Sequence, residues 1–243
     1  MATQTLEARV RAPVATFVGM LTVGLAVWLW RREPRRSVRR LGFLALATVV
    51  AQGLLGGITV LFFLPVPISV AHACLAQIFF CLAVVIAMVT GPGWTEAPRL
   101  SLSVPALTSL AIFLQLMMGA ALRHNGFGII PHLIGAGVVT GMIMATLYRV
   151  FVRHSNQPAV LRSAALLGTL LAAQLILGAA SYWVREFTRD APQPLPIMVW
   201  ITVAHVATGA LTLASSVWVA IQASSAPELA AQSRDRQGAV MPA

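Results

Sequence analysis

The chain has 243 residues, of which 58% are hydrophobic and 10% are charged. Soluble globular domains carry about a quarter charged residues, so this composition excludes a water-soluble domain built on one apolar core. The apolar residues form seven blocks, each long enough to cross a hydrocarbon layer roughly 30 Å thick as a helix. The blocks are residues 13–30, 41–63, 69–90, 103–122, 129–151, 163–184 and 196–222. We therefore predict an all-α, polytopic membrane protein with seven transmembrane helices.

The chain has 17 Lys and Arg residues against 7 Asp and Glu, a formal net charge of +10. All the basic residues are arginines, and most fall in segments 31–40, 91–102 and 149–162 and in the C-terminal tail. Basic residues gather in the cytoplasmic loops of membrane proteins. We therefore predict a multi-pass protein of the cell (inner) membrane, with the C-terminus in the cytoplasm and the N-terminus outside. Topology and contact with lipid headgroups explain the arginines, so no nucleic-acid partner is expected.

Residues 1–98 form the N-terminal half, which has three of the predicted spans. The second span ends in AQGLLGG (51–57), and the third begins with ISVAHACLAQ, which contains His72. Cys74 and Cys81 lie seven residues apart in this third span, where one helix holds them too far apart to form a disulfide with each other. We interpret both as small buried residues.

Residues 99–224 form the C-terminal half, which we predict to be a complete four-helix bundle. Residues 225–243 form a cytoplasmic tail that we expect to be disordered. In this half, LQLMMGA precedes RHNGFGIIPHLIGAG, and AQLILGA precedes VWITVAHVATGAL. These two stretches repeat the order found in the N-terminal half.

One pattern thus occurs three times: the end of a span carries Gln-x-x-x-Gly, a loop follows, and the next span has a histidine near its start. The three sets are Gln52, Gly56 and His72; Gln115, Gly119 and His132; and Gln174, Gly178 and His205. Small residues at this spacing let helices approach closely in a membrane. The pattern therefore predicts three similar helix pairs.

The three histidines have two interpretations. A single polar residue near a membrane interface commonly bonds only to water or to a carbonyl group. Three at equivalent depth favour function, because ionisable residues within spans are costly and usually face the bundle interior. Two imidazoles on facing helices can ligate haem iron, and helix bundles house such sites. We interpret His154 as a surface residue and His124 as a loop residue, with a substrate or haem-propionate contact as the alternative for His124.

The stretches QGLLGGITV…LPVPISVAHACLAQ and RHNGFGIIPHLIGAGVVTG…VAHVATGAL resemble the heme A synthase family, over residues 14–222. The resemblance implies eight spans in two pseudo-symmetric four-helix halves, each with a pair of facing histidines. It further implies a haem b in the C-terminal half. In the N-terminal half it implies that haem O is the substrate, whose C8 methyl is oxidised to the formyl group of haem A.

Carried over position by position, His132 and His205 match the haem-ligating pair of the C-terminal half, and His72 matches the second histidine of the N-terminal half. The partner of His72 should stand in a His-Arg pair before the first span, where this chain has Arg11-Ala12-Pro13. The family's preceding span and the long loop after it, which carries an acidic residue implicated in catalysis, have no counterpart here. The N-terminal half is therefore expected to be an incomplete substrate-haem bundle.

The expected function is that of a heme A synthase-like protein serving terminal-oxidase assembly, with haem O synthase and terminal oxidase subunits as partners and a homo-oligomer as one possible state. The alternative is a non-catalytic b-type cytochrome that uses only the haem between His132 and His205. We further predict that Arg123 and Arg185 bind haem propionates. Contact of both arginines with lipid headgroups is the alternative.

Overall fold

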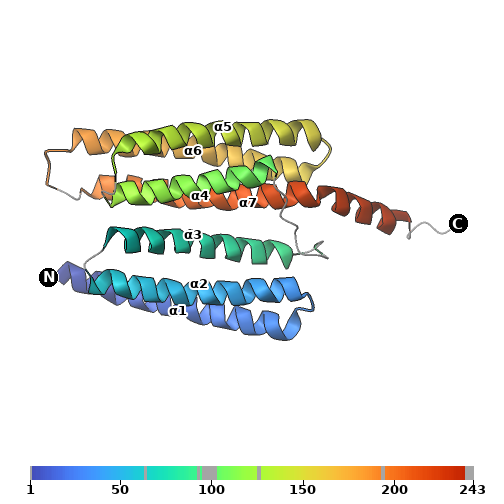
Figure 1. Ribbon diagram of the computed structural model, residues 1–243, viewed down its shortest axis with the longest axis horizontal. Coiled ribbons are helices and arrows are strands. Elements are labelled where there is room, and N and C mark those ends of the chain that lie inside the picture. Colours follow the sequence, from blue (N-terminus) through green and yellow to red (C-terminus); the bar gives the residue numbers. More distant parts are fainter. Residues whose placement is uncertain are drawn as a thin grey trace. The chain divides into compact units, whose positions relative to one another are not determined.

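The computed structural model describes residues 2–62, 65–91, 94, 103–124, 127–192 and 195–238, and within these it leaves the side chains of 2–12, 60 and 226–238 undescribed. The described chain is entirely helical apart from turns and loops (Figure 1). The helices are α1 (Ala2–Arg32), α2 (Arg36–Leu61), α3 (Val66–Val89), α4 (Val104–Arg123), α5 (Ile129–Arg153), α6 (Pro158–Phe187) and α7 (Pro196–Gly238).

All seven helices are long and apolar enough to cross a membrane. A bilayer offers no partners for backbone N–H and C=O groups, so a spanning segment satisfies them within its own helix. The predicted fold class, all-α with seven spanning helices, is therefore confirmed. The helices extend beyond the apolar blocks where the flanking sequence permits. For example, α6 begins at Pro158 because proline at the first helical position costs no hydrogen bond.

The chain divides into two compact units by its contacts. Unit 1 holds residues 1–97 together with 120–127, and unit 2 holds residues 98–119 and 128–243. Helices α1, α2 and α3 thus belong to unit 1. Helix α4 as far as Gly119 and helices α5, α6 and α7 belong to unit 2.

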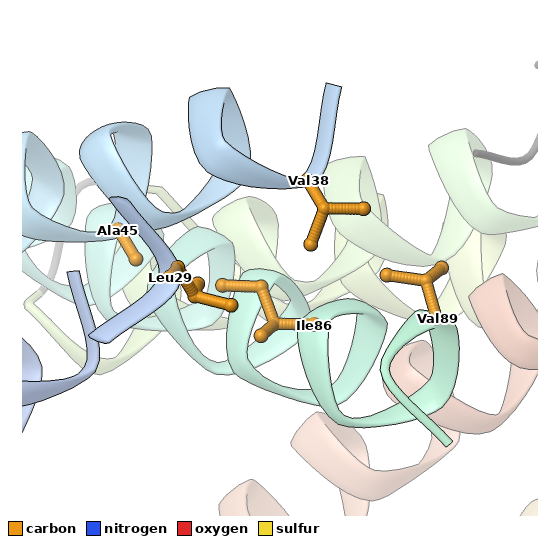
Figure 2. Close-up of a cluster of buried hydrophobic side chains, with 5 residues drawn as sticks. All are labelled: Leu29, Val38, Ala45, Ile86 and Val89. Atoms are coloured by element: carbon orange, nitrogen blue, oxygen red, sulfur yellow. The ribbon is translucent and has the colours of Figure 1, made fainter. Parts of the chain in front are cut away.

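Unit 1 has a tight apolar cluster where the three helices meet (Figure 2). Leu29 of α1 and Val38 of α2 have no exposed surface, and Val89 of α3 is equally buried. Ala45 and Ile86 complete the cluster. These residues lie where α1 ends, α2 begins and α3 ends, so the cluster fixes one end of the three-helix unit.

An ion pair closes the loop between α1 and α2 at that same end. The guanidinium of Arg35 contacts both carboxylate oxygens of Glu33, with Nε 2.6 Å from Oε1 and Nη2 2.9 Å from Oε2. A third nitrogen, Nη1, donates to the backbone carbonyl of Trp94 at 2.8 Å. The hydrogen bonds from Arg35 lower the pKa of the Glu33 carboxyl group. One arginine of the basic segment 31–40 therefore links two loops of unit 1.

Unit 2 is a four-helix arrangement, and hydroxyl groups connect its helices. Thr108 of α4 is fully buried, and its Oγ1 lies 2.8 Å from Oγ1 of Thr146 and 3.2 Å from the carbonyl oxygen of Met142, both on α5. Ser109, the next residue of α4, makes a second contact: its Oγ lies 2.9 Å from Oγ of Ser216 on α7. Helix α4 is therefore tied to both α5 and α7.

Helix α7 is longer than the apolar block that predicts it. Its apolar span covers Pro196–Ser225, and the helix continues to Gly238. Figure 1 shows this end of α7 extending past the other helices of unit 2. Most of the segment that we expected to be a disordered tail is therefore helical, and residues 239–243 lie outside the described residues.

Candidate functional site

His132 lies on the buried face of α5. Residues Val139, Ile143, Thr146 and Val150 of this helix are buried, and they recur every three or four positions. His132 lies seven residues before Val139, so it continues the same stripe, and its side chain is half-buried. The large apolar side chains next to it in sequence, such as Leu133 and Ile134, are exposed instead. The periodicity of α5 therefore directs this imidazole into unit 2.

The imidazole of His132 rests against Gly119 of α4. A Cβ added at Gly119 would lie 3.2 Å from Cε1 of the ring and 3.7 Å from Nδ1. One turn earlier on α4, Gln115 donates from Nε2 to the carbonyl oxygen of His132 at 2.8 Å and lies 3.1 Å from its Nδ1. The i, i+4 spacing places Gln115 and Gly119 on one helix face, where both contact this single histidine.

His205 has the same surroundings in the second helix pair of unit 2. A Cβ at Gly178 of α6 would lie 3.1 Å from Cε1 of His205 and 3.6 Å from Nδ1. Gln174, one turn before Gly178, places its Nε2 3.4 Å from Nε2 of the ring. His205 is half-buried and leads the buried stripe of α7 that continues through Gly209 and Thr212.

The imidazoles of His132 and His205 are both half-buried, and both histidines belong to unit 2. They come from different helices, α5 and α7. Two imidazoles from different helices form the donor set of an axially ligated haem. The two histidines that the sequence assigned to one site therefore lie in the same unit.

His72 repeats the arrangement in unit 1. A Cβ at Gly56 of α2 would lie 3.2 Å from Cε1 of His72 and 3.7 Å from Nδ1, the same two distances as at Gly119. Gln52 places its Nε2 3.4 Å from Nε2 of the ring. His72 lies three residues after buried Ser69, on the same face of α3. Each of the three predicted helix pairs therefore places a histidine ring against a glycine and beside a glutamine. The glutamine lies at Nδ1 of His132 but at Nε2 of His72 and His205.

Sequence reasoning located the Gln-x-x-x-Gly motif but gave it a weaker role than the structure does. We interpreted the small residues as a means of close helix approach, whereas each glycine provides the surface on which a histidine ring rests. Two further glycines, which we interpreted as leaving room beside the imidazoles, meet the glutamines instead. A Cβ at Gly135 would overlap Oε1 of Gln115, and a Cβ at Gly209 would lie 3.2 Å from Nε2 of Gln174. Their signal is their position three or four residues after a histidine, on the same helix face.

The remaining candidates lie outside these environments. Arg123 is the last residue of α4, and Arg185 lies near the end of α6; both are exposed. His124 is half-buried, and its backbone N–H donates to the carbonyl oxygen of Ala120 at 3.2 Å. His154 follows α5, and its Nδ1 lies 3.0 Å from Oε1 of Gln157. His124 thus lies just after α4, and His154, which we interpreted as a surface residue, is half-buried just after α5.

The cysteines take no part in a disulfide. Cys74 and Cys81 are free and half-buried on α3, in the same helix as His72. Both thiols are therefore less buried than we expected from the sequence.

The donor set of unit 2 fits a haem better than a bare metal ion. Among the described residues no group of three or more His, Cys, Asp and Glu side chains is arranged to hold an ion. A haem supplies four iron ligands of its own and needs only two from the protein. Nδ1 of His205 is buried and has no hydrogen-bond partner within the described part of the chain.

Residues 13–131 match the COX15-CtaA family model, which describes a cytochrome oxidase assembly protein. The matched segment, just under half of the chain, is similar to that family. The resemblance stated from the sequence is therefore confirmed over the matched residues. No curated protein and no solved structure matches the chain significantly.

The COX15-CtaA match covers two of the three histidine environments unequally. It includes all of Gln52, Gly56 and His72, and it includes Gln115 and Gly119. It ends one residue before His132. The site in unit 2 therefore rests on its own geometry and on its repetition of the motif inside the matched segment.

Proposed function

We propose that the chain is a haem-binding protein of cytochrome oxidase assembly that acts as a heme A synthase, oxidising the C8 methyl of haem O to the formyl group of haem A. The COX15-CtaA match supports the assembly role, and the histidine environments support haem as the ligand. In this proposal the haem b of unit 2 is held by His132 and His205, and the substrate haem is held in unit 1 with His72 as its ligand.

The observation that carries the proposal is the threefold contact of a histidine ring with a glycine and a glutamine. In all three helix pairs, Cε1 of the histidine lies 3.1–3.2 Å from the position that a Cβ on the glycine would take. Chance does not readily produce the same contact three times. A glycine that receives a ring edge gives up side-chain packing at that position. Such a loss is explained when the ring must hold a fixed direction for a bound group.

The residues of each unit have separate tasks. When bound, haem supplies the redox chemistry, because its iron changes oxidation state. His132 and His205 hold the group in unit 2, and the apolar stripes of α5 and α7 exclude water from it. His72 orients the group in unit 1. Conversion of the methyl to a formyl group takes one oxygen atom from water and releases four electrons and four protons. His132 and His205 would hold the haem that passes these electrons on to an external acceptor.

A spectrum of the purified protein tests haem binding directly. The reduced-minus-oxidised difference spectrum of the full-length chain in detergent is expected to show bands of a six-coordinate haem b. His132→Ala and His205→Ala are each expected to abolish those bands. A wild-type protein that shows no haem bands after expression with added haem precursor would overturn the proposal.

A b-type cytochrome without catalytic activity is the second candidate function. One observation favours it: His72 is the only histidine in helices α1, α2 and α3, whereas α5 and α7 carry His132 and His205. Co-expression with a haem O synthase, followed by haem extraction and chromatography, separates the two functions. Haem A in the extract supports the synthase, whereas haem b together with unconverted haem O supports the cytochrome.

Membrane placement and partners follow from the same proposal. The arginine-rich segment 31–40 and the arginines of 149–162 would face the cytoplasm. The enzyme that supplies haem O and the oxidase subunits that receive haem A would be its partners in the cell (inner) membrane. The protein would meet these partners as a single chain or as a homo-oligomer.

A further inference from the structure

Each of the three glutamines has one half of its amide group unused. Oε1 of Gln52, Gln115 and Gln174 is buried and has no hydrogen-bond partner among the described residues. The NH₂ group of the same side chain is engaged in every case, at 3.4, 3.1 and 3.4 Å from a ring nitrogen. A buried acceptor without a donor is uncommon and calls for a physical reason.

The orientation of the Gln115 amide is fixed by its contacts. One atom of this amide lies 2.8 Å from the carbonyl oxygen of His132 and 3.1 Å from Nδ1 of the same residue. A carbonyl oxygen only accepts hydrogen bonds, so that atom must be the nitrogen. The two amide hydrogens then serve the carbonyl oxygen and Nδ1, and Oε1 points elsewhere.

This orientation determines the tautomer of His132 in the chain without a ligand. Nδ1 accepts from Gln115, so the proton of the neutral ring is on Nε2. A nitrogen that carries a proton cannot donate its lone pair to iron. Ligation through Nε2 therefore requires that the proton move to Nδ1, which leaves the charge of the ring unchanged but converts Nδ1 from an acceptor into a donor.

We propose that Gln115 is a positioning residue whose side-chain oxygen accepts a hydrogen bond from Nδ1–H of His132 when Nε2 of the ring holds the ligand. This inference rests on the proposed haem binding. It gives the unused Oε1 of Gln115 a donor. Gln174 differs, because its amide nitrogen lies at Nε2 of His205 and not at Nδ1.

The glycines of α5 and α7 leave room for the amides to turn. A Cβ at Gly135 would overlap Oε1 of Gln115, and a Cβ at Gly209 would lie 3.2 Å from Nε2 and 3.9 Å from Cδ of Gln174. Any larger residue at these two positions would confine the amide. Unit 1 has Ala76 where Gly209 stands in unit 2, four residues after the histidine in both helices. The space for the glutamine is therefore a feature of unit 2.

The midpoint potential of the haem is the sensitive readout in the full-length protein. An acceptor on Nδ1–H makes the imidazole a stronger ligand, which stabilises the oxidised iron. Gln115→Leu removes the acceptor and is expected to raise the potential and to weaken haem affinity about tenfold, as loss of such a partner does elsewhere. Gln115→Glu keeps an acceptor oxygen in the same place and is expected to restore a potential at or below that of the wild type.

Gln222→Leu is the matched control. Gln222 also lies in unit 2, and its Oε1 is likewise buried without a partner among the described residues, but it stands 17 residues after His205 on α7. The control is expected to leave the potential unchanged. Equal potentials in Gln115→Leu, Gln222→Leu and the wild type would overturn the inference while leaving haem binding, and thus the proposed function, intact.

A second measurement does not depend on haem. In the ¹⁵N spectrum of histidine-labelled, haem-free, full-length protein, His132 is expected to be the Nε2–H tautomer, and Gln115→Leu is expected to shift it toward a mixture. An unchanged His132 tautomer in Gln115→Leu would overturn the pairing even if that variant retains no haem. A wild-type chain that binds no haem would overturn the proposed function and the ligation role of Gln115 together.

Discussion

Gly119 on α4 and His132 on α5 form a contact that a single methyl group would disturb. The Cβ of an alanine at position 119 would lie 3.2 Å from Cε1 of the imidazole, closer than such contacts ordinarily are. The ring would have to move by a few tenths of an ångström. The direction of Nε2 would change with it.

Gly119→Ala is therefore expected to lower haem occupancy without unfolding the protein, because alanine in a helix interior is favoured over glycine by roughly 0.5–1 kcal/mol. Occupancy is measured as haem per protein in the purified sample. Gly141→Ala is the control, since a Cβ at this position of α5 meets nothing within 4 Å. Equal losses in both variants would mean that the glycine–histidine contact has no bearing on the ligand.

Histidine substitutions test whether the two units hold separate sites. His72→Ala is expected to leave the haem spectrum of unit 2 unchanged, because the contacts of His72 with Gln52 and Gly56 lie within unit 1. His132→Ala is expected to remove that spectrum. Loss of all haem in the His72→Ala protein would contradict separate sites.

Arg123→Ala tests the propionate prediction. A guanidinium binds a carboxylate through two hydrogen bonds and stays charged at any relevant pH, so Arg123→Ala is expected to speed haem loss to a scavenging apoprotein. Arg153→Ala is the matched control, because Arg153 is also an exposed residue at the end of a helix, α5. If both variants release haem at the wild-type rate, lipid headgroups remain the explanation for Arg123.

Thr108→Val tests the hydroxyl contacts of unit 2. Valine has the same shape but removes the bonds from α4 to Met142 and Thr146 on α5. Side-chain hydrogen bonds between membrane helices contribute about 0.6 kcal/mol each and at most about 1.7, so a loss of about 1–2 kcal/mol is expected in thermal or denaturant unfolding. Thr169→Val should cost less, since exposed Thr169 bonds only within its own helix to Ala165.

Acidification tests the Glu33–Arg35 pair. The pKa of Glu33 is lowered from its ordinary value of 4.5 by hydrogen bonds from Arg35. A lowered pKa in the folded state means that the carboxylate stabilises the protein above pH 4.5 and that this contribution is lost as the pH falls through the folded value. Wild type should therefore exceed Glu33→Gln in melting temperature at pH 7, and the gap should close toward pH 3. A gap that is constant with pH would contradict this role.

The spans and the repeated motif were predictable because they depend only on the order of residues along the chain. An apolar run of sufficient length becomes a spanning helix whatever its neighbours are, so the seven spans follow from the sequence alone. The helical continuation of α7 beyond Ser225 was not predictable in this way, since that segment has no comparable apolar run.

The partners of the histidines depend on how one helix is rotated and shifted against the next. Both Gln115 and Gly119 were visible as a motif, and His132 was visible as a candidate ligand. Their contact needs α4 and α5 to meet at one depth and one rotation, which the spacing of residues within either helix does not specify. The role of Gly135 required the position of the Gln115 side chain as well, so it was out of reach of the sequence.

The bond between Ser109 and Ser216 has a mechanical consequence for unit 2. It joins α4 to α7 near the start of α4 and 11 residues after His205 on α7, whereas Gln115–His132 and Gln174–His205 each act within a consecutive pair of helices. A hinge made of two small hydroxyl groups thus holds the pairs together at one end. Under the proposed function, helices joined at this level can separate around a bound group without breaking the Ser109–Ser216 bond or the contact of either glutamine with its histidine.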